Sequence, residues 1–116
     1  MTTQKALWTL INLMQDLRRI DPEFPLQYIL CLCEIARCKN MSLTELAQTT
    51  GIPLSTTSRI IGTLAGTKGR CAGLVIVRFS ATESRRKELA LSAKGATLLT
   101  NLTRGLETMA SQRKTA

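Results

Sequence analysis

The chain has 116 residues and a mass of 12.8 kDa, which is the size of one compact domain. Apolar residues make up 44% of it, and one Trp, one Tyr and two Phe are its only aromatic residues. The core must therefore be aliphatic, and an extended base-stacking platform is excluded. Histidine, the commonest general base and metal ligand, is absent, and the eight acids are scattered as singles, so we expect no enzyme, no metal site and no cofactor.

The net charge of +8 is confined to the second half of the chain. The first 50 residues carry five bases and five acids, whereas from Ile52 onward eleven bases face only three acids. A basic half attached to a neutral half is typical of a polyanion-binding surface on a neutral scaffold. General solubility is the alternative, but a charge kept for solubility alone has no reason to avoid half of the chain.

The four cysteines predict neither a disulfide framework nor a metal site. Cys31 and Cys33 fall within one predicted helix, where their side chains point about 200° apart. We expect small buried thiols in a reducing compartment, with redox sensing as a minor alternative. No apolar run reaches the ~18 residues that a bilayer requires, and no cleavage site follows the first helix, so a cytoplasmic protein without membrane contact is expected.

The first predicted helix covers residues 3–20 and is apolar around most of its circumference. Its solvent face is expected to be a narrow polar stripe of Thr9, Asn12, Asp16 and Arg19. A chain of this length has little material to wrap such a helix, so we expect a second subunit to cover it. The expected contacts are Leu7, Leu10 and Met14. The alternative is a helix wrapped wholly by the chain's own core.

Three further helices are predicted over residues 25–38, 43–50 and 55–64. The second of them begins with a capping box, in which the Ser42 hydroxyl and the Glu45 carboxylate each bind the other residue's backbone N–H. It ends at Gly51, which can adopt the left-handed conformation that terminates helices. Two short helices joined by a glycine-containing turn predict a helix-turn-helix, in which Ala47 lets the helices cross closely.

The remaining residues predict a hairpin and a last helix. Residues 65–73 are glycine-rich and basic and predict a loop, whereas 74–79 and 87–92 predict antiparallel strands. Residues 93–110 predict a helix followed by a fraying tail; its apolar positions, expected at the dimer contact, are Leu99, Leu102 and Leu106. The fold class is mainly α with a small β-hairpin, a winged helix-turn-helix of about five helices and a two-stranded wing. Residues 1–116 form one domain, with helices 3–20 and 93–110 as its dimer interface.

The second helix of the helix-turn-helix carries the expected base contacts. Its exposed side presents short hydroxyl side chains and one arginine, as a helix entering the major groove needs: Ser55, Thr56, Ser58, Arg59 and Thr63. Arg59 can donate two hydrogen bonds to guanine O6 and N7. Backbone and minor-groove contacts are expected from the basic loop and the wing tip: Lys68, Arg70, Arg85, Arg86 and Lys87.

Five segments form a pattern of moderate specificity: residues 42–47, 51–61, 73–75, 83–87 and 89–95. Together they resemble the MarR-like winged-helix transcription regulators over residues 26–99. In that family the wing carries a D-x-R motif, whose arginine Arg85 matches, while Glu83 stands where the family has aspartate. The connection before the first wing strand is longer than the family's, and the long C-terminal dimerisation region is missing.

The resemblance implies a homodimer on a pseudo-palindromic operator. We therefore expect a sequence-specific regulator of transcription that binds double-stranded DNA, more often a repressor because an operator-bound dimer occludes polymerase, with room for a small-molecule effector. One alternative is a plasmid or phage accessory protein that binds DNA mainly through charge and recruits another protein. A third possibility is a thiol-switched regulator.

Overall fold

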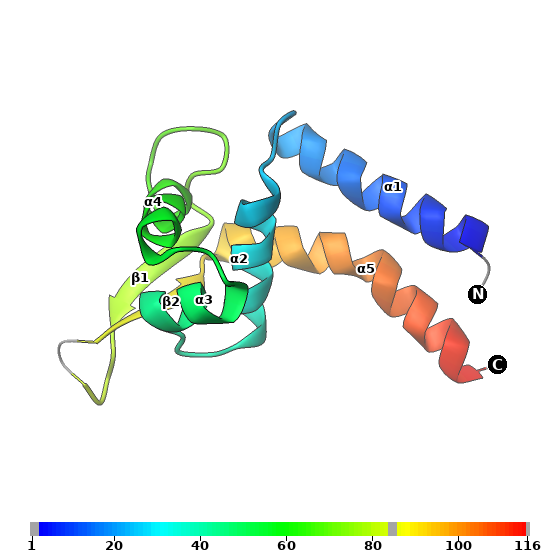
Figure 1. Ribbon diagram of the computed structural model, residues 1–116. Coiled ribbons are helices and arrows are strands. Elements are labelled where there is room, and N and C mark those ends of the chain that lie inside the picture. Colours follow the sequence, from blue (N-terminus) through cyan, green and yellow to red (C-terminus); the bar gives the residue numbers. More distant parts are fainter. Residues whose placement is uncertain (1–2, 84–85, 116) are drawn as a thin grey trace.

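The computed structural model describes residues 3–83 and 86–115, with side chains described up to Glu107. Five helices and one antiparallel hairpin follow one another in the predicted order (Figure 1). The elements are α1 (Thr3–Ile20), α2 (Leu26–Arg37), α3 (Leu43–Thr50), α4 (Leu54–Leu64), β1 (Val75–Phe79), β2 (Lys87–Leu91) and α5 (Ala93–Thr115). The predicted winged helix-turn-helix is confirmed. Within the described residues, no helix is long and apolar enough to cross a membrane.

The last helix is longer than the sequence predicted. We expected an end near Ala110 and a fraying tail, but the backbone of α5 is helical as far as Thr115. Neither glycine nor proline occurs after Gly105, and the last turns contain Gln112, Arg113 and Lys114, which are good helix formers. Nothing in the local sequence therefore stops the helix earlier.

The core lies where α2, α3, α4 and the hairpin meet. Its most deeply buried side chains come from each of these parts: Cys31, Leu32, Leu46, Thr57, Leu64, Leu74 and Val75. Leu99 and Leu102 join them from α5 and are only 8% and 6% exposed. The expectation that these two leucines form a dimer contact was wrong, because α5 packs on α1, α2 and β2, and both side chains are buried in the chain's own core.

The helix-turn-helix is fixed by its caps. The Glu45 backbone N–H donates to the Ser42 hydroxyl at 3.2 Å, and the Ser42 N–H donates to the Glu45 carboxylate at 2.9 Å, which completes the predicted capping box. Gly51 ends α3 with a φ of 78°, a conformation that favours glycine. The buried Thr57 hydroxyl then donates to the Ile52 carbonyl at 3.3 Å and the Pro53 carbonyl at 3.0 Å, which ties α4 to the turn.

The wing is anchored at the root of the hairpin. β1 and β2 pair with Val75 opposite Leu91 and Phe79 opposite Lys87, and Met41 adds one bridge to Leu89. At the start of α5, the Ser92 hydroxyl donates to the Gly73 carbonyl at 2.6 Å and accepts from the Gly95 N–H at 3.0 Å. These contacts hold the hairpin both to Met41, just before α3, and to the start of α5.

Helix α1 leaves uncovered the apolar face that we expected a second subunit to cover, but one residue of its predicted polar stripe is placed differently. Thr9, which we expected on the solvent-facing polar stripe, is half-buried beside α5. A methyl group added at Gly105 of α5 would lie 3.3 Å from Cγ2 of Thr9. The opposite face is left uncovered by the chain and carries four large apolar side chains that are 45–51% exposed: Leu7, Leu10, Ile11 and Met14. The alternative of a helix wrapped wholly by the chain's own core is therefore wrong.

Candidate nucleic-acid interface

The outward face of α4 carries the predicted recognition residues. Ser55, Ser58 and Arg59 are exposed, and Thr56 and Thr63 are half-buried at its margins. The opposite face, formed by Thr57, Ile60, Ile61 and Leu64, is buried against the core. Burial of this inner face fixes the rotation of α4, so its short polar side chains must point away from the core.

Arg59 is the cation at the middle of this face. Within the described part of the chain, no hydrogen bond or ion pair engages its guanidinium. The Thr63 hydroxyl, one helical turn further on, donates to the Arg59 backbone carbonyl at 3.3 Å, so its proton is used within the helix. Arg59 is thus presented with all its donors available, which a bidentate contact with guanine requires.

The basic loop leaves one end of α4, and the wing hairpin projects on the other side of that helix (Figure 1). Lys68 and Arg70 are exposed in the loop, whereas Cys71 and Ala72 directly after them are buried. The Cys71 thiol donates to an Asp21 carboxylate oxygen at 3.5 Å, which fastens the end of the loop to the turn between α1 and α2. The end of the basic loop is therefore held in place, and the exposed Lys68 and Arg70 lie just before this fixed point.

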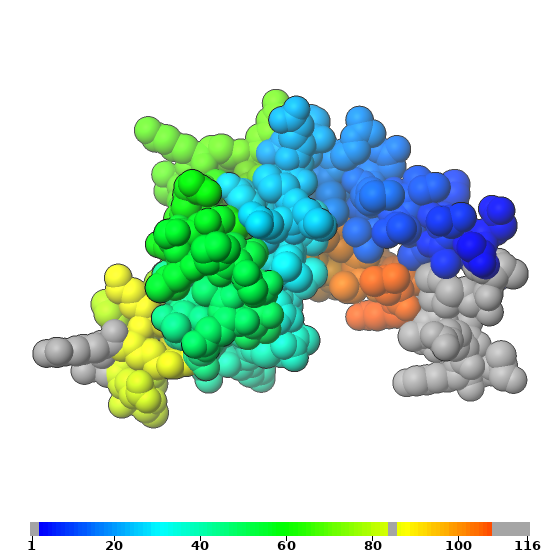
Figure 2. Space-filling view, in the orientation of Figure 1, coloured from blue at the N-terminus to red at the C-terminus, as the bar shows by residue number. Residues whose placement is uncertain are grey.

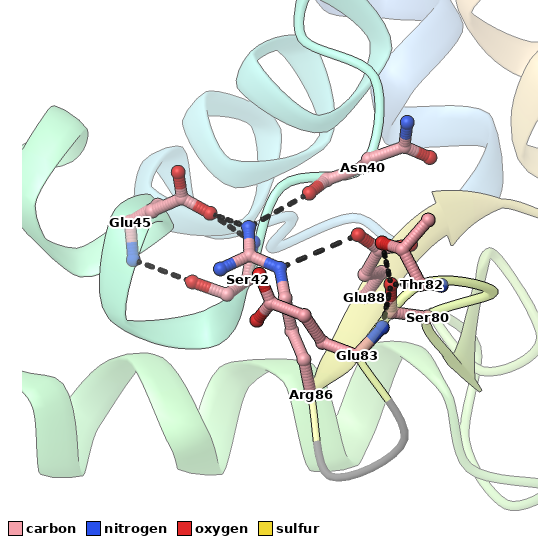
Figure 3. A network of polar contacts seen from close by, with 8 residues as sticks. All are labelled: Asn40, Ser42, Glu45, Ser80, Thr82, Glu83, Arg86 and Glu88. Carbon is pink, nitrogen blue, oxygen red and sulfur yellow. Dashed lines mark hydrogen bonds and ion pairs between the residues drawn. The ribbon is translucent and has the colours of Figure 1, made fainter.

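The wing tip departs from the sequence prediction. Lys87 is exposed, and Arg85 lies outside the described residues. Arg86, which we expected to hold a DNA phosphate, has its guanidinium engaged by the chain itself (Figure 3). It forms ion pairs with Glu45 of α3 and Glu88 of β2 and donates to the Asn40 carbonyl. These bonds engage Nε and Nη2, so the chain itself competes with DNA for this guanidinium, and the phosphate contact stays a prediction.

Electrostatics reinforce this network. The Ser42 N–H, followed by the Arg86 guanidinium, holds the pKa of the Glu45 carboxyl below its ordinary value of 4.5. The Glu45 hydrogen bond, opposed by partial burial, raises the pKa of Arg86. Both groups are therefore charged throughout the physiological range. Sequence reasoning missed their ion pair because Glu45 and Arg86 are 41 residues apart and only the tertiary fold brings them together.

Sequence reasoning also passed over Arg78. It is exposed on β1, opposite Glu88 in the strand register, yet no ion pair between the two occurs in the described structure. Its place in the basic half of the chain was the available signal. Arg78 adds a further cation to the hairpin, on the face opposite that of Lys87.

Three of the four cysteines lack the lowered pKa of a redox-sensing thiol, although Cys33 is exposed and not buried as expected. Burial raises the pKa of Cys31, and burial together with the nearby Glu34 charge raises that of Cys33. The pKa of Cys71 is raised to about 11, by burial first and then by its Asp21 partner. A sensor thiol needs a lowered pKa, so these three are poorly suited to the role. Among the described residues, no cluster of His, Cys, Asp and Glu could hold a metal ion.

A hollow of about 410 Å³ opens between α2, β2 and α5. Its walls are mostly apolar and include Cys33, Ala36, Leu91 and Leu99, with Arg37 and Glu107 at its margins. A small-molecule effector stays a prediction.

The comparisons with known proteins agree with this architecture. A family model described as the IclR helix-turn-helix domain matches residues 35–67, from the end of α2 through α4. No curated protein matches the chain by sequence.

Solved structures give similarities over nearly the whole chain. RV1404 from Mycobacterium tuberculosis is 19% identical, with a TM-score of 0.73 over 92% of this chain and 70% of that one. MepR of S. aureus in a complex with DNA is 19% identical, with a TM-score of 0.68 over 97% and 81%. The transcriptional repressor CouR, bound to a 23-mer DNA duplex, is 21% identical, with a TM-score of 0.63 over 97% and 74%. The resemblance inferred from the sequence is therefore confirmed at the level of structure: the chain has the winged helix-turn-helix fold of the MarR-like regulators, MepR and CouR among them.

Proposed function

We propose that the protein is a sequence-specific regulator of transcription that binds double-stranded DNA as a homodimer and acts as a repressor. The observation that carries the proposal is the outer face of α4. It presents Ser55, Ser58 and an unengaged Arg59 on a helix whose inner face is locked in the core. MepR and CouR, two of the similar proteins whose solved structures contain DNA, support the same use of the fold.

In this proposal α4 enters the major groove. Arg59 donates two hydrogen bonds to a guanine, and the neighbouring hydroxyls bind adjacent base edges. Lys68 and Arg70 on one side and Lys87 on the other contact phosphates, while the wing tip follows the minor groove. Arg59 and the cations around it have different roles in this proposal. A bidentate donor can distinguish one base from another, whereas a point charge binds a phosphate of any sequence.

A second copy of the chain gives the uncovered face of α1 a partner. The four large apolar side chains of that face are roughly half exposed in the single chain. Apolar patches of this kind mark association surfaces. A two-fold dimer would also place two α4 helices on one side, which suits half-sites one helical turn apart. Occlusion of polymerase by a bound dimer is the reason for proposing a repressor.

An assembly protein that binds DNA through charge is the second candidate, and one observation favours it. Ile76, Val77 and Phe79 on β1 are 43%, 44% and 66% exposed. An apolar strand on the wing suits a protein partner. The two candidates differ in sequence preference, because binding through charge alone gives a ratio of specific to non-specific affinity near one.

A selection from random duplexes, followed by salt-titrated binding, tests the proposal. On the selected site, Arg59→Ala should weaken binding by about 1–3 kcal/mol and relax the base preference, whereas Lys68→Ala should weaken all sequences alike and reduce the salt slope by about one unit. Lys5→Ala removes one positive charge from the first turns of α1, at the end that extends away from α4 (Figure 1), and serves as the control. A wild-type protein that enriches no sequence would favour the assembly function. An unchanged affinity of Arg59→Ala would refute the groove contact.

A further inference from the structure

We propose that Arg86 is a positioning residue, which ties the tip end of the wing, just before β2, to the first turn of α3 and does not bind DNA phosphate. The proposal deepens the DNA-binding function above and rests on it for one of its two readouts. It concerns a residue that the sequence alone places among the DNA contacts.

One planar group contacts three separate segments (Figure 3). Nη2 of Arg86 donates to the Asn40 carbonyl at 3.1 Å, in the turn between α2 and α3, and to Oε1 of Glu45 in the capping box. Nε donates to Oε2 of Glu88 on β2 at 3.3 Å. Arginine suits this role because its donors are fixed in a rigid fork, whereas lysine offers one compact charge.

The surroundings of Arg86 leave little positive potential for a phosphate. Its single positive charge faces the two carboxylates of Glu45 and Glu88, so the three side chains together carry a net negative charge. The Arg86 side chain is 31% exposed and that of Glu88 only 12%. A phosphate approaching this group would meet a guanidinium that is already neutralised, and it would have to compete with two carboxylates for that positive charge.

The position of the network explains what it does for DNA binding. A hollow between the first turn of α3 and the wing is lined by Ser42, Thr44, Glu45, Arg86 and Lys87. The first helix of a helix-turn-helix crosses the DNA backbone, so this hollow faces the expected path of the phosphates. Arg86 neutralises Glu45 there and holds the strand that carries Lys87. Its effect on DNA is therefore transmitted through the two carboxylates.

A cycle of variants separates positioning from direct contact. Binding of a labelled mixed-sequence duplex at low salt is measured for the wild type, Arg86→Gln, Glu45→Gln/Glu88→Gln and the triple variant. Glutamine at position 45 retains the bond to the Ser42 N–H, since a capping box accepts Glu or Gln. Positioning predicts that Arg86→Gln weakens binding about tenfold in the wild type but less than about twofold when both carboxylates are absent. A tenfold loss in both backgrounds would identify a phosphate contact and overturn the proposal, as would a negligible loss in the wild type.

A second readout requires no DNA. Amide hydrogen exchange at Arg86–Leu89 should be faster in Arg86→Gln and in Arg86→Lys than in the wild type, because lysine cannot bridge all three partners. Unchanged exchange in both variants would reject the proposal even if the duplex assay failed. Arg37→Gln, which breaks an exposed pair with Glu34 on α2, is the matched control and should change neither measurement. A wild type that binds no duplex would reject the proposed function, while the exchange data would still decide the role of Arg86.

Discussion

Two arginines of the basic half show how the surroundings of a residue decide its use. Arg59 and Arg86 carry the same charge, and the sequence assigns both to DNA. In the folded chain no described residue engages the Arg59 guanidinium, whereas Glu45, Glu88 and Asn40 engage that of Arg86. Net charge counts both equally, but only a guanidinium with free donors can bind a base or a phosphate.

The Cys71 thiol should be nearly inert in the folded protein. With a pKa of about 11, about one molecule in a thousand carries a thiolate there at pH 8, and the thiolate is the form that reacts. We expect alkylation by iodoacetamide, mapped by mass spectrometry, to leave Cys71 unmodified under native conditions. In denaturant the same residue should react quickly, which provides the internal control. Rapid native alkylation would show that the anchor to Asp21 is open in solution.

Glu45 should contribute to the pH dependence of stability. Its pKa is lowered in the folded state, so its stabilising contribution is fully present above about pH 4.5 and is lost as the pH falls through the lower folded value. Urea unfolding across the acid range should therefore show a shallower loss of stability for Glu45→Gln than for the wild type. An identical acid dependence in the two proteins would contradict the assigned hydrogen bonds.

At the scale of elements, the junction of the wing with α5 depends on one glycine. A methyl added at Gly95 would overlap the Leu74 carbonyl, which is backbone and cannot swing away. That carbonyl also accepts from the Ser92 N–H at 3.0 Å, so a displacement would break the start of α5. We expect Gly95→Ala to lower the free energy of unfolding by about 3 kcal/mol.

Gly62→Ala is the matched control for this measurement. Gly62 lies inside α4 with open space where a methyl would go, so the same substitution should raise stability by up to about 1 kcal/mol through helix propensity. Thermal and urea unfolding of the two variants measure both effects. Equal effects of the two substitutions would show that α5 does not approach Leu74 as closely as described.

The elements themselves were predictable because their signals are local. The capping box at Ser42 and Glu45, the left-handed Gly51 and the two strands each depend on residues a few positions apart, and the structure has all three. The burial of Leu99 and the contact of Thr9 with α5 were not predictable, because they depend on which helix faces which. The outward rotation of α4 followed from its apolar inner face, whereas the engagement of Arg86 needed a partner 41 residues away.

The whole molecule is less compact than its length alone requires. Its radius of gyration is 15.6 Å, and its extents are 48 × 31 × 26 Å, whereas a compact domain of this size would have a radius of about 13 Å. Figures 1 and 2 show the cause: α1 and α5 extend together to one side of the helix-turn-helix body. Two paired helices projecting from a body expose apolar surface that a second copy can cover.

The oligomeric state tests this arrangement. Replacing Leu10 and Met14 with glutamine removes two side chains that are 51% and 47% exposed on α1, so the chain should stay folded but lose its partner. Sedimentation at micromolar concentration should show a dimer for the wild type and a monomer for Leu10→Gln/Met14→Gln. Ile76→Gln/Val77→Gln, at 43% and 44% exposed positions on the wing, is the control and should remain dimeric. If the wing variant dissociates while the α1 variant does not, the wing strand is the contact between copies and α1 needs another partner.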